Sequence, residues 1–266
     1  MPRAILNAVS FQAVADNLRE SFRVIAASRE PGEIREMRGV SIASAGVAFQ
    51  MFNAAFLSAP VATENDLSQR VLLAATHFQQ RGLDWAYWIC DDWIDGHPRR
   101  RMRQILERNG LRHSVDLPGM FAEGLRPPVR PAPVLEVRRV ENAPTREAFC
   151  SIGSVCFHVP IHWFMEVFSG DVVWREFHSY VGYLRGEPVS TAAVVTGGGV
   201  LGVYNVATLP GHQRRGYGEH VMRCAIEDVG RRNGKQAVVL QSTPAGLRLY
   251  ERMGFRTITR VAVYAT

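Results

Sequence analysis

The sequence lacks any apolar run that approaches the roughly 20 residues needed to cross a bilayer. Its beginning, Met1 to Asn17, has no basic stretch followed by a long apolar run, so we expect no export signal. Cysteine is scarce: Cys90, Cys150, Cys156 and Cys224 are scattered without a CxxC pair. Because a chain of 266 residues does not need disulfides, we expect reduced thiols in a cytoplasmic protein.

Metal-ligand patterns are also missing. His158 and His162 are four residues apart, but Pro160 lies between them and no third ligand is near, which favours packing over a metal site. The net charge is +6, and the densest basic run is Arg99 to Arg103 at the start of a predicted helix. We expect a solvated helix face there, with no nucleic-acid or membrane partner, because no zinc spacing or aromatic-basic motif accompanies the charge.

The segment Leu125 to Pro133 reads LRPPVRPAP, and its four prolines disfavour both helix and sheet. We therefore predict two domains, 1–124 and 135–266, joined by a linker over 125–134. In the second, the pattern predicts strands at 135–140, 201–208, 237–241 and 255–264, a hairpin over 179–196, and helices at 216–233 and 245–253. Helical or irregular segments fill 144–168, so the fold class is α/β with a mixed sheet.

The first half ends in a similar way, with predicted helices at 67–81 and 102–109 around a strand at 85–89. Residues 105–111, ILERNGL, match residues 249–255, LYERMGF, position for position in character. This match predicts an internal duplication.

A basic, glycine-containing loop joins the strand at 201–208 to the next helix, and it reads LPGHQRRGYG over 209–218. A helix N-terminus has unpaired N–H groups and a partial positive charge, and glycines let the backbone approach phosphate oxygens. The loop therefore predicts an anion site. Rossmann and P-loop motifs do not fit, since there is no third glycine and no Gly-Lys-Ser/Thr.

The order Gln-x-x-Gly-x-Gly after a strand resembles the loop with which the GNAT superfamily of N-acetyltransferases holds the pyrophosphate of coenzyme A. Residues 241–255, QSTPAGLRLYERMGF, look like the closing motif of that family. The sequence departs from the commonest pattern at Thr243 and Gly246, where many members carry asparagine and alanine. The resemblance covers about residues 135–266.

The resemblance implies a GNAT fold, two such domains in tandem, and acetyl-CoA as cosubstrate without a metal. It implies acetyl transfer to an amine of a small molecule or peptide by direct attack in a ternary complex. The implied cofactor-binding residues are Val206, Ala207, Thr208, Gln213, Arg214, Arg215, Gly216, Tyr217, Gly218, Ser242, Thr243, Gly246 and Tyr250. Tyr250 is also the implied catalytic acid that protonates the leaving thiolate.

Some roles stay open at this stage. The general base could be Glu176, His178, Glu219, Glu227 or water. The aromatic residues Trp163, Phe164, Phe168 and Trp174 could line an acceptor pocket or pack in the core. The acceptor amine and the oligomeric state are not predicted.

The N-terminal half lacks the corresponding features. Counting back from Gly82 and Gly234 places Thr63 to Asp66 opposite Arg215 to Gly218, and its two carboxylates would repel a pyrophosphate. Leu106 takes the place of Tyr250. We therefore expect a degenerate domain that keeps the fold without binding the cofactor. The alternative for the whole chain is a non-catalytic acyl-CoA sensor or interaction protein.

Overall fold

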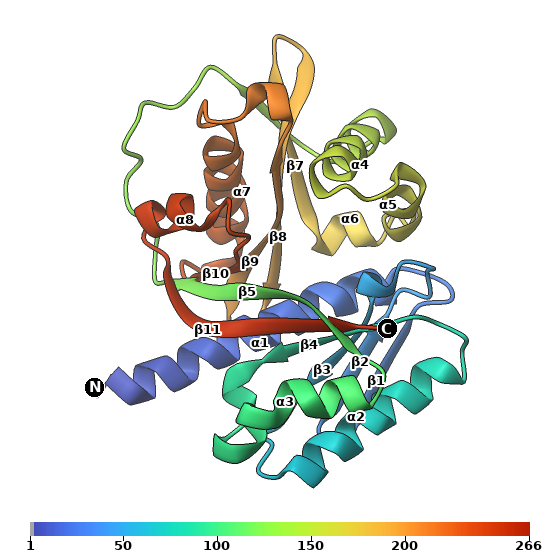
Figure 1. Cartoon of the computed structure of the whole chain (residues 1–266). Coiled ribbons are helices and arrows are strands. Elements are labelled where there is room, and N and C mark those ends of the chain that lie inside the picture. Colours follow the sequence, from blue (N-terminus) through green and yellow to red (C-terminus); the bar gives the residue numbers. More distant parts are fainter. Residues whose placement is uncertain (1–2) are drawn as a thin grey trace.

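The computed structural model describes residues 3–266 and contains one continuous mixed sheet of eleven strands (Figure 1). The first half comprises α1 (Arg3–Ala27), β1 (Glu33–Met37), β2 (Val40–Ser44), η1 (Gln50–Phe52), β3 (Asn53–Leu57), α2 (Glu64–Gln79), β4 (Ala86–Cys90), η2 (Asp91–Trp93), α3 (Gly96–Arg108) and β5 (Arg112–Ala122).

The second half comprises β6 (Glu136–Arg139), α4 (Ala143–Phe157), α5 (Ile161–Val167), α6 (Val173–Glu176), β7 (His178–Leu184), β8 (Glu187–Gly197), β9 (Val200–Thr208), η3 (Pro210–His212), α7 (Tyr217–Asn233), β10 (Val238–Gln241), α8 (Leu247–Met253) and β11 (Arg256–Ala265). Each element that the sequence predicts after residue 135 is present, with bounds that differ by up to two residues. α7 and α8 end as expected, at Gly234 and Gly254 in the left-handed conformation.

The last strands of the two halves are exchanged. The strand order is β1-β2-β3-β4-β11-β5-β10-β9-β8-β7-β6, so β11 pairs with β4, and β5 pairs with β10. Val261 and Ala262 of β11 accordingly lie in the core of the first half, whereas Met120 and Ala122 of β5 lie in the core of the second. Each half thus buries a strand that belongs, along the chain, to the other.

This exchange explains the stiff segment between the halves. β5 lies in the middle of the sheet and β6 at its edge, five strand spacings or about 24 Å away. Residues 123–135 have no regular structure, and extended proline-rich chain of that length reaches about 40 Å. The segment arcs around α8 and α7 (Figure 1) and is fixed at its start by the Arg126 N–H, which donates to Met253 O at 2.9 Å. The domain boundaries themselves stay a prediction.

α1 lies between the two halves and contacts both. Asn17 is fully buried, and its side-chain amide donates to Val195 O and Gly197 O at 3.1 and 3.0 Å. Phe22, one and a half turns later, packs on Trp88 of the first half with ring centroids 5.2 Å apart. Gly202 of β9 leaves the necessary space, because a Cβ there would lie 1.6 Å from Asn17 Oδ1. α1 therefore sets the angle between the halves.

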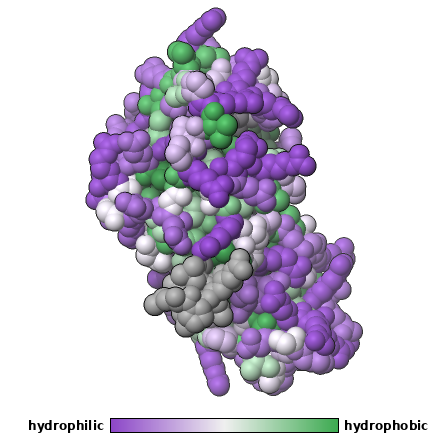
Figure 2. Space-filling model, turned by 90° about the vertical axis from the view of Figure 1, so that its left-hand side faces the viewer, coloured by the Kyte–Doolittle hydropathy of each residue, from purple (hydrophilic) through white to green (hydrophobic). Residues whose placement is uncertain are grey.

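In the second half, helices cover both faces of the sheet. Ala192 and Val194 of β8 pack in the cluster that includes α7, while Ala193 and Val195 pack in the cluster that includes α4 and α5. This alternation is what a strand covered on both faces requires. Figure 2 shows the side of the molecule with α8 and the linker, where hydrophilic residues predominate and apolar ones are scattered between them.

Candidate active site

The candidate site lies where two parallel strands separate. β9 and β10 pair from Leu201 with Val238 to Val203 with Leu240, and then they part. Beyond that point Thr208 pairs with Ser190 of β8, whereas the Ser242 N–H donates to Pro118 O of β5 at 2.9 Å. A bulge helps β9 to diverge, since Asn205 adopts a left-handed conformation with φ 49° beside a shift in the β8–β9 register. The gap between the strands therefore exposes backbone groups of both.

The loop after β9 offers unpaired donors at the mouth of this gap. Arg214 and Gly216 have φ values of 62° and 83°, an alternation that turns successive N–H groups toward one side. The N–H groups of residues 214–216 have no acceptor within residues 3–266. The side chains of Arg214 and Arg215 are exposed and form no ion pair there either. The loop can hold an anion at the start of α7, a helix of 17 residues.

The loop is held against β9 by short contacts. Gln213 Nε2 donates to Thr208 O at 3.1 Å. A Cβ on Gly218 would lie 3.1 Å from Thr208 Oγ1 and 3.7 Å from Val206 Cγ1, so this glycine lets the first turn of α7 approach the strand. Tyr217 is buried beside it, and Ala207 points to the opposite side, into the cluster that includes α4. Residues 206–208 and 213–218 are thus brought together.

Tyr250 enters the same part of the molecule from α8. It belongs to the core cluster that includes Val203, Leu240 and, at its rim, Val206. Its ring is buried and its hydroxyl has no hydrogen-bond partner within residues 3–266, while burial raises the pKa of Tyr250 to about 12. Tyr250 therefore keeps its proton at neutral pH and can donate it.

Gly246 and Thr243, the two residues that depart from the common family pattern, have different surroundings. A Cβ on Gly246 would lie 2.7 Å from Tyr250 Cε2, so glycine there makes room for the ring. Thr243 is exposed, and its carbonyl accepts the hydroxyl of buried Ser242 at 2.8 Å.

Two residues that the sequence analysis missed adjoin this site. Cys156 of α4 lies beside the backbone N–H of Thr208, which lowers the pKa of the thiol against the larger, raising effect of burial. Gln241 ends β10 where the strands part, and its Nε2 is buried without a partner among the described residues. No motif singles out either residue, because their positions depend on strand pairing.

The remaining candidates are placed as follows. Glu219 and Glu227 pair with Arg223 and Arg231, so neither is a free base, and Arg139 lies beside His178. Phe164, Phe168 and Trp174 are core residues, as the packing alternative had it, whereas Trp163 is partly exposed and stacks on Phe49. Within residues 3–266, no cluster of metal-ligating side chains occurs, and no helix is both long and apolar enough for a membrane span.

The equivalent gap in the first half is closed. β3 and β4 pair in parallel from Ala54 to Phe56, but Val61 then rejoins the chain after β4: its N–H donates to Trp93 O at 2.7 Å, and its carbonyl accepts from the Asp95 N–H at 3.2 Å. Here α2 starts after Thr63, whose side chain caps it, as α7 starts after Gly216. The correspondence of the helix starts is thus shifted by one residue from the expected alignment.

Arg70 completes this closure. Its guanidinium donates to Ala59 O at 2.5 Å, to Pro60 O at 2.7 Å and to Asp66 at 2.8 and 2.9 Å. Asp66 and Arg70 are the third and seventh residues of α2, as Glu219 and Arg223 are of α7. Arg223 instead reaches away to Arg126 O at 2.8 Å. In the first half, Arg70 therefore binds the carbonyls of the loop before α2. The corresponding loop before α7 in the second half stays open.

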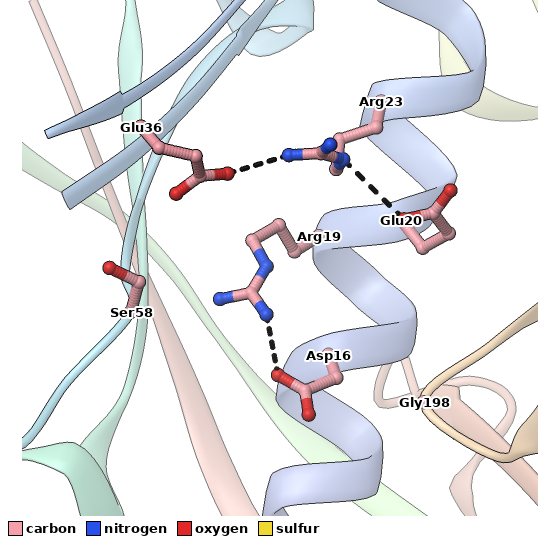
Figure 3. Close-up of a pocket in the computed structure, with 7 residues that line it drawn as sticks. All are labelled: Asp16, Arg19, Glu20, Arg23, Glu36, Ser58 and Gly198. Carbon is pink, nitrogen blue, oxygen red and sulfur yellow. Dashed lines mark hydrogen bonds and ion pairs between the residues drawn. The ribbon is translucent and has the colours of Figure 1, made fainter. Parts of the chain in front are cut away.

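A separate open cavity lies elsewhere. It has a volume of about 530 Å³ and is lined by Asp16, Arg19, Glu20, Arg23, Glu36, Ser58 and Gly198 (Figure 3). Arg19 pairs with Asp16 at 2.8 Å, and Arg23 with Glu36 at 2.6 Å, so its charges largely neutralise one another. Gly198 lies just before β9, whereas the loop of residues 209–216 follows this strand. The cavity is therefore at the other end of β9, about 27 Å from that loop.

Comparison with known proteins agrees with this geometry. Residues 141–255 match the acetyltransferase (GNAT) family. A GCN5-related N-acetyltransferase from Kribbella flavida has a TM-score of 0.69 and 17% identity over 91% of this chain and 93% of that one. A putative GNAT-family acetyltransferase from Novosphingobium aromaticivorans gives 0.58 and 15% over 95% and 97%. None of the curated proteins matches the sequence.

A tandem GNAT protein from the clavulanic acid biosynthesis pathway is also similar, with a TM-score of 0.54 and 11% identity over 85% of this chain and 78% of that one. At these identities the likeness shows the fold alone. Residues 141–255 therefore form a GNAT acetyltransferase domain, and the fold of the chain is similar to that of GNAT proteins, including one with two GNAT units in tandem. The family and the fold support acyl transfer as the general activity.

Proposed function

We propose that the C-terminal half binds acetyl-CoA between β9 and β10 and transfers its acetyl group to an amine. The observation that carries the proposal is the gap between these strands, which opens beside a loop of unpaired N–H groups and arginines. The pyrophosphate would lie on residues 213–218 at the start of α7. The pantetheine arm would extend along the backbone of Val206 and Thr208.

The chemistry needs an unprotonated amine, because its lone pair attacks the thioester carbonyl carbon in a ternary complex. A carbon–nitrogen bond forms, the carbon–sulfur bond breaks, and the nitrogen gives up one proton to water or a base. Tyr250 donates its proton to the departing thiolate, which leaves as the free thiol of coenzyme A, and the proton released from the nitrogen restores the phenol by way of water. The raised pKa of Tyr250 keeps that proton available across the physiological range.

The N-terminal half, in this proposal, binds no cofactor. The backbone bonds of Val61 and the guanidinium of Arg70 occupy the space that a pyrophosphate and pantetheine arm would need. Its carboxylates Glu64 and Asp66, at the start of α2, add charge repulsion. The half supplies a strand to the shared sheet and a wall beside the site.

Calorimetric titration with acetyl-CoA tests the proposal. We expect one site per chain in the wild type and at least about a 100-fold weaker affinity in Gly216→Glu, because a carboxylate then stands at the helix start. Gly82→Glu is the matched control: Gly82 also has a positive φ, 62°, and open space around it, but it follows α2 in the first half. Two sites per chain, or equal losses in both variants, would contradict the assignment.

The alternative is a non-catalytic acyl-CoA sensor, in which Tyr250 only anchors α8. Its burial in the core cluster favours such a structural role in addition to the catalytic one. Incubation of the protein with acetyl-CoA and an amine panel, followed by mass spectrometry of the products, separates the two. Acetylated amine supports the transferase, and binding without any product supports the sensor.

A further inference from the structure

A set of apolar side chains between the first half and the end of β10 is neither buried nor fully exposed. From the N-terminal half and its exchanged strand come Phe49, Met51, Phe52, Trp88 and Leu117, which we call the first arc. All five are apolar and partly exposed. Trp88 and Leu117 belong to β4 and β5, whereas Phe49, Met51 and Phe52 belong to η1 and the residue before it.

The first arc begins at the candidate site. Leu117 is next to Pro118, whose carbonyl accepts the Ser242 N–H. Leu117, Met51 and Trp88 pack against one cluster around Val263. The first arc therefore extends from the strand residue next to Pro118 to η1, which precedes β3.

Aromatic contacts continue the line across the boundary between the halves. Phe22 lies 5.2 Å from Trp88 and 6.2 Å from Phe52, measured between ring centroids. Phe52 is 5.8 Å from Phe49, which stacks on Trp163 of α5 at 5.0 Å. The stacked pair joins the first half to the helices of the second.

The second arc returns to the site from the C-terminal half, through Trp163, Val159, Cys156 and Leu209. Val159, Cys156 and Leu209 are partly buried against the same cluster as Phe49 and Phe52. Leu209 directly follows β9, and Cys156 lies beside the Thr208 N–H. The two arcs thus meet on one core cluster, and the second arc ends beside the last residue of β9.

Neither arc contains a charged side chain. Glu166 of α5, on the helix that carries Trp163, is paired with Arg29 at 3.4 Å. An amine that carries several positive charges would lose hydration there without gaining a carboxylate partner. An amine on an aromatic or aliphatic body would instead bury apolar surface against both arcs.

We infer that the acceptor is a monoamine with an aromatic or extended apolar body, held by the two arcs while its nitrogen attacks in the gap. The inference rests on the proposed acetyl transfer. It gives the N-terminal half a part in substrate selection, since the first arc comes from that half and its exchanged strand.

Competing acceptors test the inference. With acetyl-CoA saturating, release of the coenzyme thiol is measured with 2-phenylethylamine and with spermidine at equal ionic strength. We expect kcat/KM to be at least about tenfold higher for 2-phenylethylamine. An equal or higher value for spermidine, or no transfer to 2-phenylethylamine, overturns the inference.

Variants locate the effect. Met51→Glu should lower kcat/KM for 2-phenylethylamine by about tenfold or more and leave the acetyl-CoA affinity unchanged, because Met51 adjoins the gap only through the first arc. Trp163→Ala in the second arc should act in the same direction, which covers the case in which the first variant does not fold. Leu72→Glu, on the exposed face of α2, is the control and should change nothing.

Unchanged kinetics in both arc variants would overturn the inference. Failure of the proposed function would look different: the wild type would not bind acetyl-CoA in the calorimeter at all. If the wild type bound acetyl-CoA but had a higher kcat/KM for spermidine, only the inferred class of acceptor would be wrong.

Discussion

The two halves of the chain place a helix between two parallel strands in the same way and differ in the loop that starts the helix. The loop after β9 is long, exposed and rich in unpaired donors. The loop after β3 is instead tied by backbone hydrogen bonds of Val61 to the chain after β4. The third and seventh helix residues are acidic and basic in both halves. Arg70, however, donates to the carbonyl of Pro60 in its own loop, whereas Arg223 donates to the carbonyl of Arg126 in the linker. An open loop and a closed loop thus arise from one framework through a few local interactions.

The largest expected effect is on the closed loop. Arg70→Met should lower the free energy of unfolding by about 3 kcal/mol, because buried Arg70 is the charged hydrogen-bond donor to three groups, the carbonyls of Ala59 and Pro60 and the partly exposed Asp66 carboxylate. Chemical denaturation followed by tryptophan fluorescence measures this loss. Arg223→Met, at the equivalent place in α7, should cost about 1 kcal/mol or less, and similar losses in the two variants would remove the distinction between the halves.

Tyr250→Phe should lower kcat by about 100-fold with little change in acetyl-CoA affinity, since it removes the proton donor and keeps the ring. Steady-state kinetics together with calorimetry separate the two quantities. Leu106→Tyr, in the equivalent helix of the first half, should give no new activity. An unchanged kcat in Tyr250→Phe would show that another group protonates the thiolate.

The raised pKa of Tyr250 also fixes the sign of a pH effect. A folded-state pKa of about 12 means that the phenol stays protonated until the pH passes well above 10, so kcat should not fall through loss of the acid between pH 7 and about 10. A pH profile of kcat with buffers of constant ionic strength measures this. A decline with a midpoint near pH 8 would point to a different acid.

Arg214→Ala with Arg215→Ala should weaken acetyl-CoA binding by about tenfold at low salt and by less at high salt, because the arginines are exposed and their attraction is screened. Calorimetry at two salt concentrations gives both values. The matched control in the first half is Arg100→Ala with Arg103→Ala, on the exposed face of α3, which should leave affinity unchanged. A loss of acetyl-CoA affinity that did not depend on salt would mean that the substitutions had changed the conformation of the loop rather than only its charge.

The smallest effect concerns the ring of Tyr250. Gly246→Ala should lower kcat by a few-fold, since its Cβ would stand 2.7 Å from the ring and force the phenol to shift. Gly124→Ala, where a Cβ meets nothing within 4 Å, is the control. An unchanged kcat would show that the ring has room to move without loss of function.

Local signals allowed much of the second half to be predicted. Gly234 and Gly254 end helices, Arg185 and Gly186 form a hairpin turn with positive φ, and the apolar residues of α7 recur at helical spacing. These are properties of neighbouring residues, so a sequence pattern contains them. The loop motif predicted an anion site for the same reason, because a strand, a glycine loop and a helix start are contiguous.

The first half shows the limits of such patterns. No sequence pattern predicted α1 or the strands β1, β2, β3 and β5. α1 buries Asn17 against one half and Phe22 against the other, so its contacts follow no single apolar stripe. β5 begins with three exposed residues and becomes buried only where it crosses into the second half. Both elements take their character from partners far away in the sequence.

The sequence by itself determined the likeness of residues 141–255 to the GNAT family, the order of elements in the second half, and the glycine-containing loop and Tyr250 as candidates for a site, since each depends on residues close together in the chain. Only the tertiary structure decided the strand exchange, the closure by Val61 and Arg70, and the meeting of Phe49 with Trp163. These features join residues that are ten to more than a hundred positions apart. The stability of these contacts depends on which surfaces meet when the chain folds, and a local sequence pattern does not contain that information.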